Sequence, residues 1–324
     1  MSTSTTSRTY RLLALCAVLP LLLLTACGNG GDAFDEGAGD TASNGSGNGA
    51  EVVIAGQAYS EMKIMTAMYA ALLENAGYKT TIKSVDRAVY APELESGAVH
   101  VSADYAASMT EYLNVEENGP DAKQLASHDV GETIAALTAL GKDRGIVPLE
   151  PAKAQDANAF MVTKEVSEKF GITRLSDLKK LDQPLTLAAA PECPEREDCK
   201  LGLERVYGIK ISKVEPLGFG TVQTKDAVKN GEVDFGQVGT SDATVDQLGL
   251  VVLEDDKALE NAENLTPVVN VEFLEAHEDV ADILNELSAT LTTDDLQGLI
   301  AQVDTERALP EDVAKQYLED KGLL

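Results

Sequence analysis

Apolar and polar residues alternate along the chain in two distinct periods. Residues 51–55 are Glu51 followed by four apolar residues, and this run ends at Gly56, which is typical of a buried strand. Apolar side chains then recur at helical spacing over residues 60–76, where Ser60 can cap the start of the helix. Gly77 follows directly and can end it. This stretch predicts a strand followed by an amphipathic helix.

The same alternation continues beyond Gly77. Residues 79–85 predict a second strand, and the following helix passes through Leu94 and ends at Gly97. Residues 99–101 predict a short third strand. Because strand and helix keep alternating to the C-terminus, we expect α/β architecture with largely parallel sheets.

One segment of the chain is echoed far downstream. Residues 94–101 resemble residues 228–235, since each reads as a helix end, a glycine (Gly97 or Gly231) and a short strand. A polar loop follows each strand, at the position where open α/β sheets bind ligands. Two such units far apart suggest two lobes facing one cleft, although helix–glycine–strand units also occur throughout α/β proteins.

Helix caps are expected after both of these loops. Ser108 with Glu111 fits a capping box, and Ser241 or Asp242 can cap the corresponding helix in the second unit.

The first 26 residues have the features of a secretory signal. Arg8 and Arg11 precede an apolar stretch over residues 12–24 that is short for a membrane span. The stretch ends in Leu-Thr-Ala and then Cys27, which resembles a bacterial lipobox. We therefore expect residues 1–26 to be a lipoprotein signal peptide, with Cys27 lipidated and the protein exported and anchored to the outer face of the cytoplasmic membrane. The alternative is an ordinary signal peptide with a cysteine there by chance.

Residues 27–50 predict a lipid-anchored flexible linker, because Gly, Asn, Asp, Ser and Ala dominate it and cannot bury enough apolar surface to order it. Residues 51–324 remain for the folded part. The chain is strongly acidic, with a formal net charge of −28. This argues against nucleic-acid partners, which need clustered cations. It is consistent with a solvated acidic surface or with attraction of cationic ligands.

Two cysteines, Cys193 and Cys199, remain after the signal region. In an exported protein, such close spacing favours a disulfide that closes a small loop. A zinc site would need more ligands, and the three histidines are scattered elsewhere, so we expect no metal.

No catalytic motif is present: the sequence lacks a GxSxG elbow, an HExxH pair, a P-loop and an EF-hand pattern. No nucleophile–base pair can be nominated. We expect a protein that is not an enzyme and uses no cofactor, with an exported lipoprotein enzyme as the less favoured alternative.

Residues 53–61, Val-Ile-Ala-Gly-Gln-Ala-Tyr-Ser-Glu, resemble the opening strand and first cleft loop of osmoprotectant-binding proteins. These OpuAC-like and ProX-like lipoproteins are the glycine betaine, carnitine and choline receptors of ABC importers. Further resemblance follows in order along almost all of 51–324, over segments 94–112, 151–163, 192–208, 229–242, 250–257 and 267–269.

This resemblance implies a two-lobed periplasmic-binding-protein-like fold of type II. Each lobe would be a mostly parallel sheet flanked by helices, and two crossing strands would form a hinge. We place the crossings near 146–151 and 250–254. Lobe I then comprises 51–152 plus 255–324, and lobe II comprises 153–254. The implied partners are a small solute and the permease subunits, and we expect a monomer.

Quaternary ammonium groups have no N–H donors, so aromatic faces and carboxylates must stabilise them. A ligand carboxylate would need hydroxyl, amide or helix N-terminal donors. By position, the resemblance implies these ligand-binding residues: Gln57, Tyr59, Ser60, Glu61, Asp104, Tyr105, Asp156, Asn158, Phe219, Thr221, Thr240, Ser241 and Asp242.

The chain departs from this family where relatives often carry aromatic residues, near Asn158 and at Gly239, and it contains no tryptophan. A full aromatic cage cannot be assembled from the matching positions. Either Asp104, Asp156 or Asp242 holds the cation, or the ligand is a different, more polar compatible solute.

Overall fold

The computed structural model describes residues 47–120 and 122–324. The expected signal peptide, the lipidation at Cys27 and most of the linker lie outside these residues. Among the described residues, no helix has the length and apolar character needed to cross a membrane.

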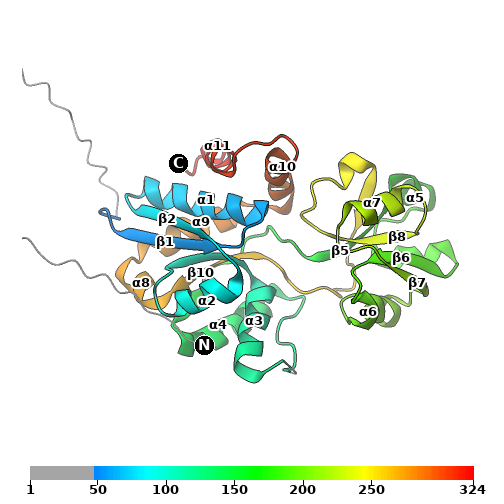
Figure 1. Ribbon diagram of the computed structural model, residues 1–324, viewed down its shortest axis with the longest axis horizontal. Helices are drawn as coiled ribbons and strands as arrows, with labels where there is room; N and C mark the ends of the chain where they lie inside the picture. The colour runs from blue at the N-terminus through cyan, green and yellow to red at the C-terminus, as the bar shows by residue number, and fades with distance from the viewer. Residues whose placement is uncertain (1–46, 121) are drawn as a thin grey trace, which may run out of the picture. The chain divides into compact units, whose positions relative to one another are not determined.

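Two five-stranded sheets with equivalent strand arrangements form the core of the folded part (Figure 1). The first has the order β2-β1-β3-β10-β4 and the second the order β7-β6-β8-β5-β9. The first contains β1 (Glu51–Gly56), β2 (Lys79–Ser84), β3 (Val101–Tyr105), β4 (Ile146–Pro148) and β10 (Leu265–Asn270). The second contains β5 (Asn158–Thr163), β6 (Leu185–Ala189), β7 (Ile211–Pro216), β8 (Phe235–Gly239) and β9 (Leu250–Leu253).

Helices cover both faces of the first sheet. The apolar side chains of α1 pack with those of the C-terminal helices on one face, and a separate apolar cluster fills the other face. Since α1 lies between the sheet and further helices, it is buried on most sides rather than along one stripe. The first face carries α1 (Ser60–Asn75), α8 (Val271–Ala276), α9 (Asp279–Thr290), α10 (Thr293–Asp304) and α11 (Pro310–Lys321); the second carries α2 (Arg87–Glu95), α3 (Ala106–Asn118) and α4 (Val130–Gly141).

The second sheet is also covered on both faces. On one face α7 (Val222–Lys229) packs against β8 and its neighbours. The other face holds α6 (Lys200–Gly202), the turn that follows it and the side chains of both cysteines. A short helix, α5 (Lys164–Phe170), continues directly from β5.

Each sheet is mixed, with two parallel and two antiparallel strand pairs, rather than mostly parallel. The antiparallel strand in each is the one that the chain enters after crossing from the other sheet. The connecting segments span residues 149–157 and 254–264, and Gln155 bridges Asn264 between them. They begin a little later than the expected 146–151 and 250–254, because residues 146–148 and 250–253 are themselves strands.

Both connections join the same kind of sheet edge. The start of β5 pairs with the end of β8 at Asn158 and Gly239, and the start of β10 pairs with the end of β3 at Leu265 and Tyr105. The strands that precede the crossings, β4 and β9, also end at this edge. The loops at the carboxyl ends of the parallel strands are therefore brought toward one another, which is where open α/β sheets bind ligands.

The internal echo corresponds to equivalent structure in the two sheets. The helices α2 and α7 end at Glu95 and Lys229, and the following strands begin at Val101 and Phe235. The third strand thus starts two residues after the predicted 99–101. Gly97 and Gly231 adopt left-handed backbone angles, with φ of 76° and 70°, that residues with a side chain rarely adopt.

The predicted helix caps after these strands are wrong. Helix α3 begins at Ala106, so Ser108 lies inside its first turn and hydrogen-bonds Glu263. The segment after β8 forms a turn and a short 3₁₀ helix, Asp246–Leu248, so neither Ser241 nor Asp242 caps an α-helix. The local cap pattern in the sequence does not show that the strand ends at Tyr105 and that the helix begins directly after it.

A disulfide joins Cys193 and Cys199, as the spacing predicts. Both side chains are fully buried in the apolar cluster of the second sheet, where they contribute to packing as well as to chain connectivity.

Replacing both cysteines, as Cys193→Ala/Cys199→Ala, should lower the free energy of unfolding. Chain entropy for so short a loop accounts for about 2 kcal/mol, and the lost packing adds to it. The urea midpoint of the double variant, measured beside the oxidised wild type, should fall. An unchanged midpoint would show that the disulfide contributes no stability.

Candidate ligand-binding site

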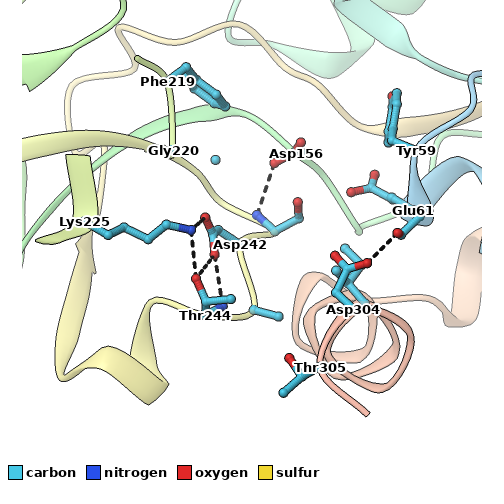
Figure 2. A pocket seen from close by; sticks show the side chains of 15 residues that line it. Tyr59, Glu61, Asp156, Phe219, Gly220, Lys225, Asp242, Thr244, Asp304 and Thr305 are labelled. Atoms are coloured by element: carbon cyan, nitrogen blue, oxygen red, sulfur yellow. Dashed lines mark hydrogen bonds and ion pairs between the residues drawn. The ribbon is translucent and has the colours of Figure 1, made fainter. Parts of the chain in front are cut away.

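A cavity of about 380 Å³ lies where loops of the two sheets meet (Figure 2). This volume is within the range of small-molecule sites. The first lobe contributes the segment that leads into α1 and the end of α10, the second contributes the loops before α7 and after β8, and the first connecting segment contributes Asp156. The lining residues are Tyr59, Ser60, Glu61, Asp156, Phe219, Gly220, Lys225, Gly239, Ser241, Asp242, Ala243, Thr244, Ile300, Asp304 and Thr305.

Two aromatic side chains line the cavity from different lobes. Tyr59 precedes α1 and Phe219 lies shortly before α7, with exposed fractions of 41% and 47%. Figure 2 shows them on separate walls of the cavity. Aromatic faces left accessible in this way can cover the apolar and cationic parts of a ligand.

Glu61 is a buried acid at the first-lobe wall, in the first turn of α1. The Tyr105 hydroxyl donates a hydrogen bond to Oε1 of its carboxyl group. Burial, and to a smaller extent the nearby charge of Asp156, raises the pKa of Glu61 to about 8, although hydrogen bonds from Tyr105 and Ser241 act in the opposite direction. Glu61 is therefore mostly protonated at neutral pH.

Asp156 lies on the connecting segment just before β5. Its Oδ1 accepts a hydrogen bond from the backbone N–H of Ser241 at 3.2 Å, and burial raises its pKa. A Cβ atom at Gly239 would lie 2.5 Å from the same Oδ1. Asp156 thus occupies the space that a side chain at position 239 would need, which explains physically why no aromatic residue stands there.

Lys225 forms a compact polar cluster on the second-lobe wall. Its Nζ lies 2.6 Å from Asp242 Oδ2 and 2.8 Å from Thr244 Oγ1, and the residue is only 7% exposed. Asp242 also accepts hydrogen bonds from the backbone and hydroxyl of Thr244. The carboxylate of Asp242 is therefore already compensated by a neighbouring cation.

Several residues predicted from the sequence do line this cavity, whereas others have different surroundings. Asp104 is buried away from it, bound by Arg87 through an Nε–Oδ2 distance of 2.9 Å and by the hydroxyl of Tyr90. Thr221 caps α7. Those that line the cavity are Tyr59, Ser60, Glu61, Asp156, Phe219, Ser241 and Asp242, and those that do not are Gln57, Asp104, Tyr105, Asn158, Thr221 and Thr240.

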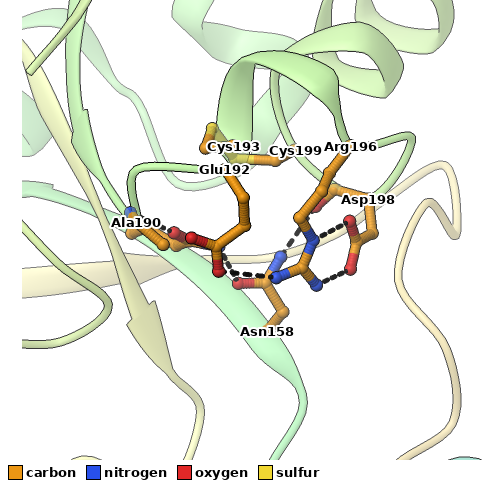
Figure 3. Close-up of a disulfide and its surroundings, with 8 residues drawn as sticks. Asn158, Ala190, Glu192, Cys193, Arg196, Asp198 and Cys199 are labelled. Atoms are coloured by element: carbon orange, nitrogen blue, oxygen red, sulfur yellow. Dashed lines mark hydrogen bonds and ion pairs between the residues drawn. A yellow bond between two sulfur atoms is a disulfide. The ribbon is translucent and has the colours of Figure 1, made fainter. Parts of the chain in front are cut away.

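Asn158 and Thr240 line a second cavity of about 500 Å³ beside the connecting segments. Figure 3 shows Asn158 next to the disulfide loop, where its Nδ2 donates to the carbonyl of Asp198 at 2.8 Å. Thr240 Oγ1 accepts from the N–H of Ala157 and donates to the carbonyl of Gln155. Both side chains therefore make structural hydrogen bonds at the start of β5.

Two charged residues of the cavity were missed from the sequence. Lys225 follows Thr221 by four residues and so shares its face of α7, which is the one signal that could have indicated it. Asp304 ends α10 and accepts a hydrogen bond from Ser60, more than 240 positions earlier, and no local pattern indicates that contact. No group of three or more His, Cys, Asp or Glu side chains in the described part of the chain is arranged to hold a metal ion.

The sequence matches, over residues 50–320, the family described as the substrate binding domain of ABC-type glycine betaine transport systems. The chain belongs to this family. It is 27% identical over 284 residues to a glycine-betaine-binding protein of Pseudomonas aeruginosa, covering 84% of this chain and 88% of that one. It is also 26% identical over 161 residues to the carnitine transport binding protein OpuCC of Listeria monocytogenes, about half of each chain.

The solved structure of apo YehZ from Escherichia coli has a similar fold, with a TM-score of 0.73 and 24% identity over 85% of this chain and 99% of that one. The expected fold class, two α/β lobes of the type II periplasmic-binding-protein kind, is confirmed.

Glu61→Gln should change how stability depends on pH. In the wild type, unfolded Glu61 ionises near pH 4.5 whereas the folded residue keeps its proton to about pH 8, so this group reduces stability as pH rises between those values. Relative to wild type, the variant should gain about 3–4 kcal/mol between pH 5 and pH 8. Urea unfolding of both proteins at the two pH values measures this, and parallel pH curves would contradict it.

Proposed function

We propose that this protein is the extracytoplasmic receptor of an ABC importer and captures a quaternary amine or related compatible solute, of the glycine betaine, choline or carnitine type. The observation that carries the proposal is the cavity between the lobes, which combines two accessible aromatic faces with buried carboxyl groups. The match to the family over residues 50–320 supports the same conclusion.

The cavity chemistry suits a cation that has no N–H donors. Tyr59 and Phe219 can present ring faces to methylated ammonium, and Asp156 can supply negative charge without needing a hydrogen bond from the ligand. Asp304 adds a second carboxylate on the first-lobe side. We propose that these residues, with Ser60, Glu61, Ser241 and Asp242, form the binding site.

The proposed transport role requires the two lobes to close on the solute, and the two connecting segments are where this movement would occur. Residues 149–157 and 254–264 allow the lobes to close on a ligand by small changes in backbone angle. The closed lobes would then present one surface to the permease subunits. We propose a monomer with no enzymatic activity, divided into lobe I (51–152 plus 255–324) and lobe II (153–254).

Binding of the proposed solutes can be measured directly by calorimetry and by thermal shift. Glycine betaine, choline, carnitine, ectoine and proline form the panel. A ligand at about 100 times its Kd should raise the free energy of unfolding by about 2.7 kcal/mol. If no member of the panel bound, the osmoprotectant function would be wrong, and binding of ectoine or proline alone would favour the alternative of a more polar solute.

The same experiment tests the cavity assignment. Phe219→Ala should weaken binding of the best ligand at least several-fold, because it removes one aromatic wall. Phe170→Ala is the matched control, since Phe170 is similarly exposed but lies outside the cavity. Equal effects of the two substitutions would place the ligand elsewhere.

We further propose that the mature protein is held at the outer face of the membrane by lipid on Cys27. The apolar stretch over 12–24, followed directly by this cysteine, supports the assignment. Cys27→Ala should abolish labelling by radioactive palmitate in the native host and move the protein from the membrane fraction to the soluble fraction. Labelling that persisted in the variant would rule out Cys27 as the anchor.

A further inference from the structure

The two walls of the cavity differ in charge. The first lobe and the connecting segment contribute three acidic residues to the cavity lining and, among the described residues, no lysine or arginine. The three are Glu61, Asp156 and Asp304. The second lobe contributes an ammonium group, that of Lys225, paired with Asp242. Figure 2 shows the lysine cluster on one side and Glu61 with Asp304 on the other.

The ammonium group of Lys225 has one N–H donor more than the acceptors that the described residues provide. A lysine side chain carries three N–H donors. Asp242 Oδ2 and Thr244 Oγ1 accept two of them, and no third acceptor is hydrogen-bonded to Nζ among residues 47–120 and 122–324. Since Lys225 lines the cavity, an acceptor on a bound solute can complete its coordination.

The position of Nζ is fixed by its surroundings. Lys225 is 7% exposed and lies on α7, which begins at Val222 beside the cavity. The positive end of this helix favours negative charge in the same region. Because the lysine is already desolvated and held by two acceptors, little ordering of its side chain is needed when a ligand binds.

We propose that Lys225 determines specificity by binding the carboxylate of a zwitterionic solute, so that the receptor prefers betaines over cations that lack an acidic group. The cationic end of the ligand then lies toward Asp156 and Asp304, between the rings of Tyr59 and Phe219. Asp242 and Thr244 act as positioning residues that hold the ammonium in place. This inference deepens the proposed function and rests on it.

Glycine betaine and choline provide the test, because both carry a trimethylammonium group and differ in having a carboxylate or a hydroxyl. A site built to bind a charged group rejects the analogue that lacks it. Calorimetry on the purified wild-type protein should therefore give a Kd for glycine betaine at least about tenfold lower than for choline.

Lys225→Met should weaken glycine betaine binding by about tenfold or more while changing choline binding less than about threefold. Lys225→Arg, which keeps the charge, should recover part of the loss. Lys229→Met is the matched control: it lies on the same helix, is exposed and does not line the cavity. It should leave both affinities unchanged.

Lys225→Met leaves Asp242 without its cation and can destabilise the protein. The double variant Lys225→Met/Asp242→Asn removes both charges and should show the same selective loss of glycine betaine binding. Thermal unfolding of each variant confirms that the folded protein is being measured.

The outcomes separate this inference from the proposed function. Equal wild-type affinity for glycine betaine and choline, or equal weakening of both ligands in the lysine variants, would overturn the role of Lys225 and leave the receptor function standing. A wild-type protein that bound no solute of the panel would overturn the proposed function, and this inference with it.

Discussion

The structure depends on one topological constraint: both crossings between the two sheets leave and enter at the carboxyl edges of the parallel strands. The pairing of Asn158 with Gly239 and of Leu265 with Tyr105 places the crossing segments at these edges. The loops that follow β1, β3 and β8 must therefore converge near the same connecting segments. The cavity that Tyr59, Asp156 and Phe219 line lies at this place.

Charge in this cavity is controlled by pairing and burial rather than by the net charge of the chain. Asp242 is neutralised by Lys225 in the cavity wall, and Asp104, which lies outside the cavity, is neutralised by Arg87. Burial raises the pKa of Glu61 to about 8, so this side chain is mostly uncharged at neutral pH. A chain with a net charge of −28 thus has few carboxylates that can meet a cation inside the cavity.

The aromatic content of the cavity has a related explanation. Asp156 lies where a side chain at position 239 would have to lie, since a Cβ there would approach its Oδ1 to 2.5 Å. A carboxylate thereby takes the place of an aromatic wall. Tyr59 and Phe219 supply ring faces from separate lobes, so the cavity lining is complete only when both lobes are present.

The order of strands and helices, the echo between residues 94–101 and 228–235, and the disulfide could be predicted from the sequence, because each depends on local periodicity or short spacing. Much of the cavity lining could be placed only through a family resemblance. The roles of Asp104, Lys225 and Asp304 were decided by tertiary structure. Their hydrogen-bond partners lie 17 to 244 positions away along the chain, and no local pattern indicates them. The local sequence around an acidic residue does not show whether its carboxylate faces a ligand or a buried arginine. Only the fold determines which charged groups lie next to it.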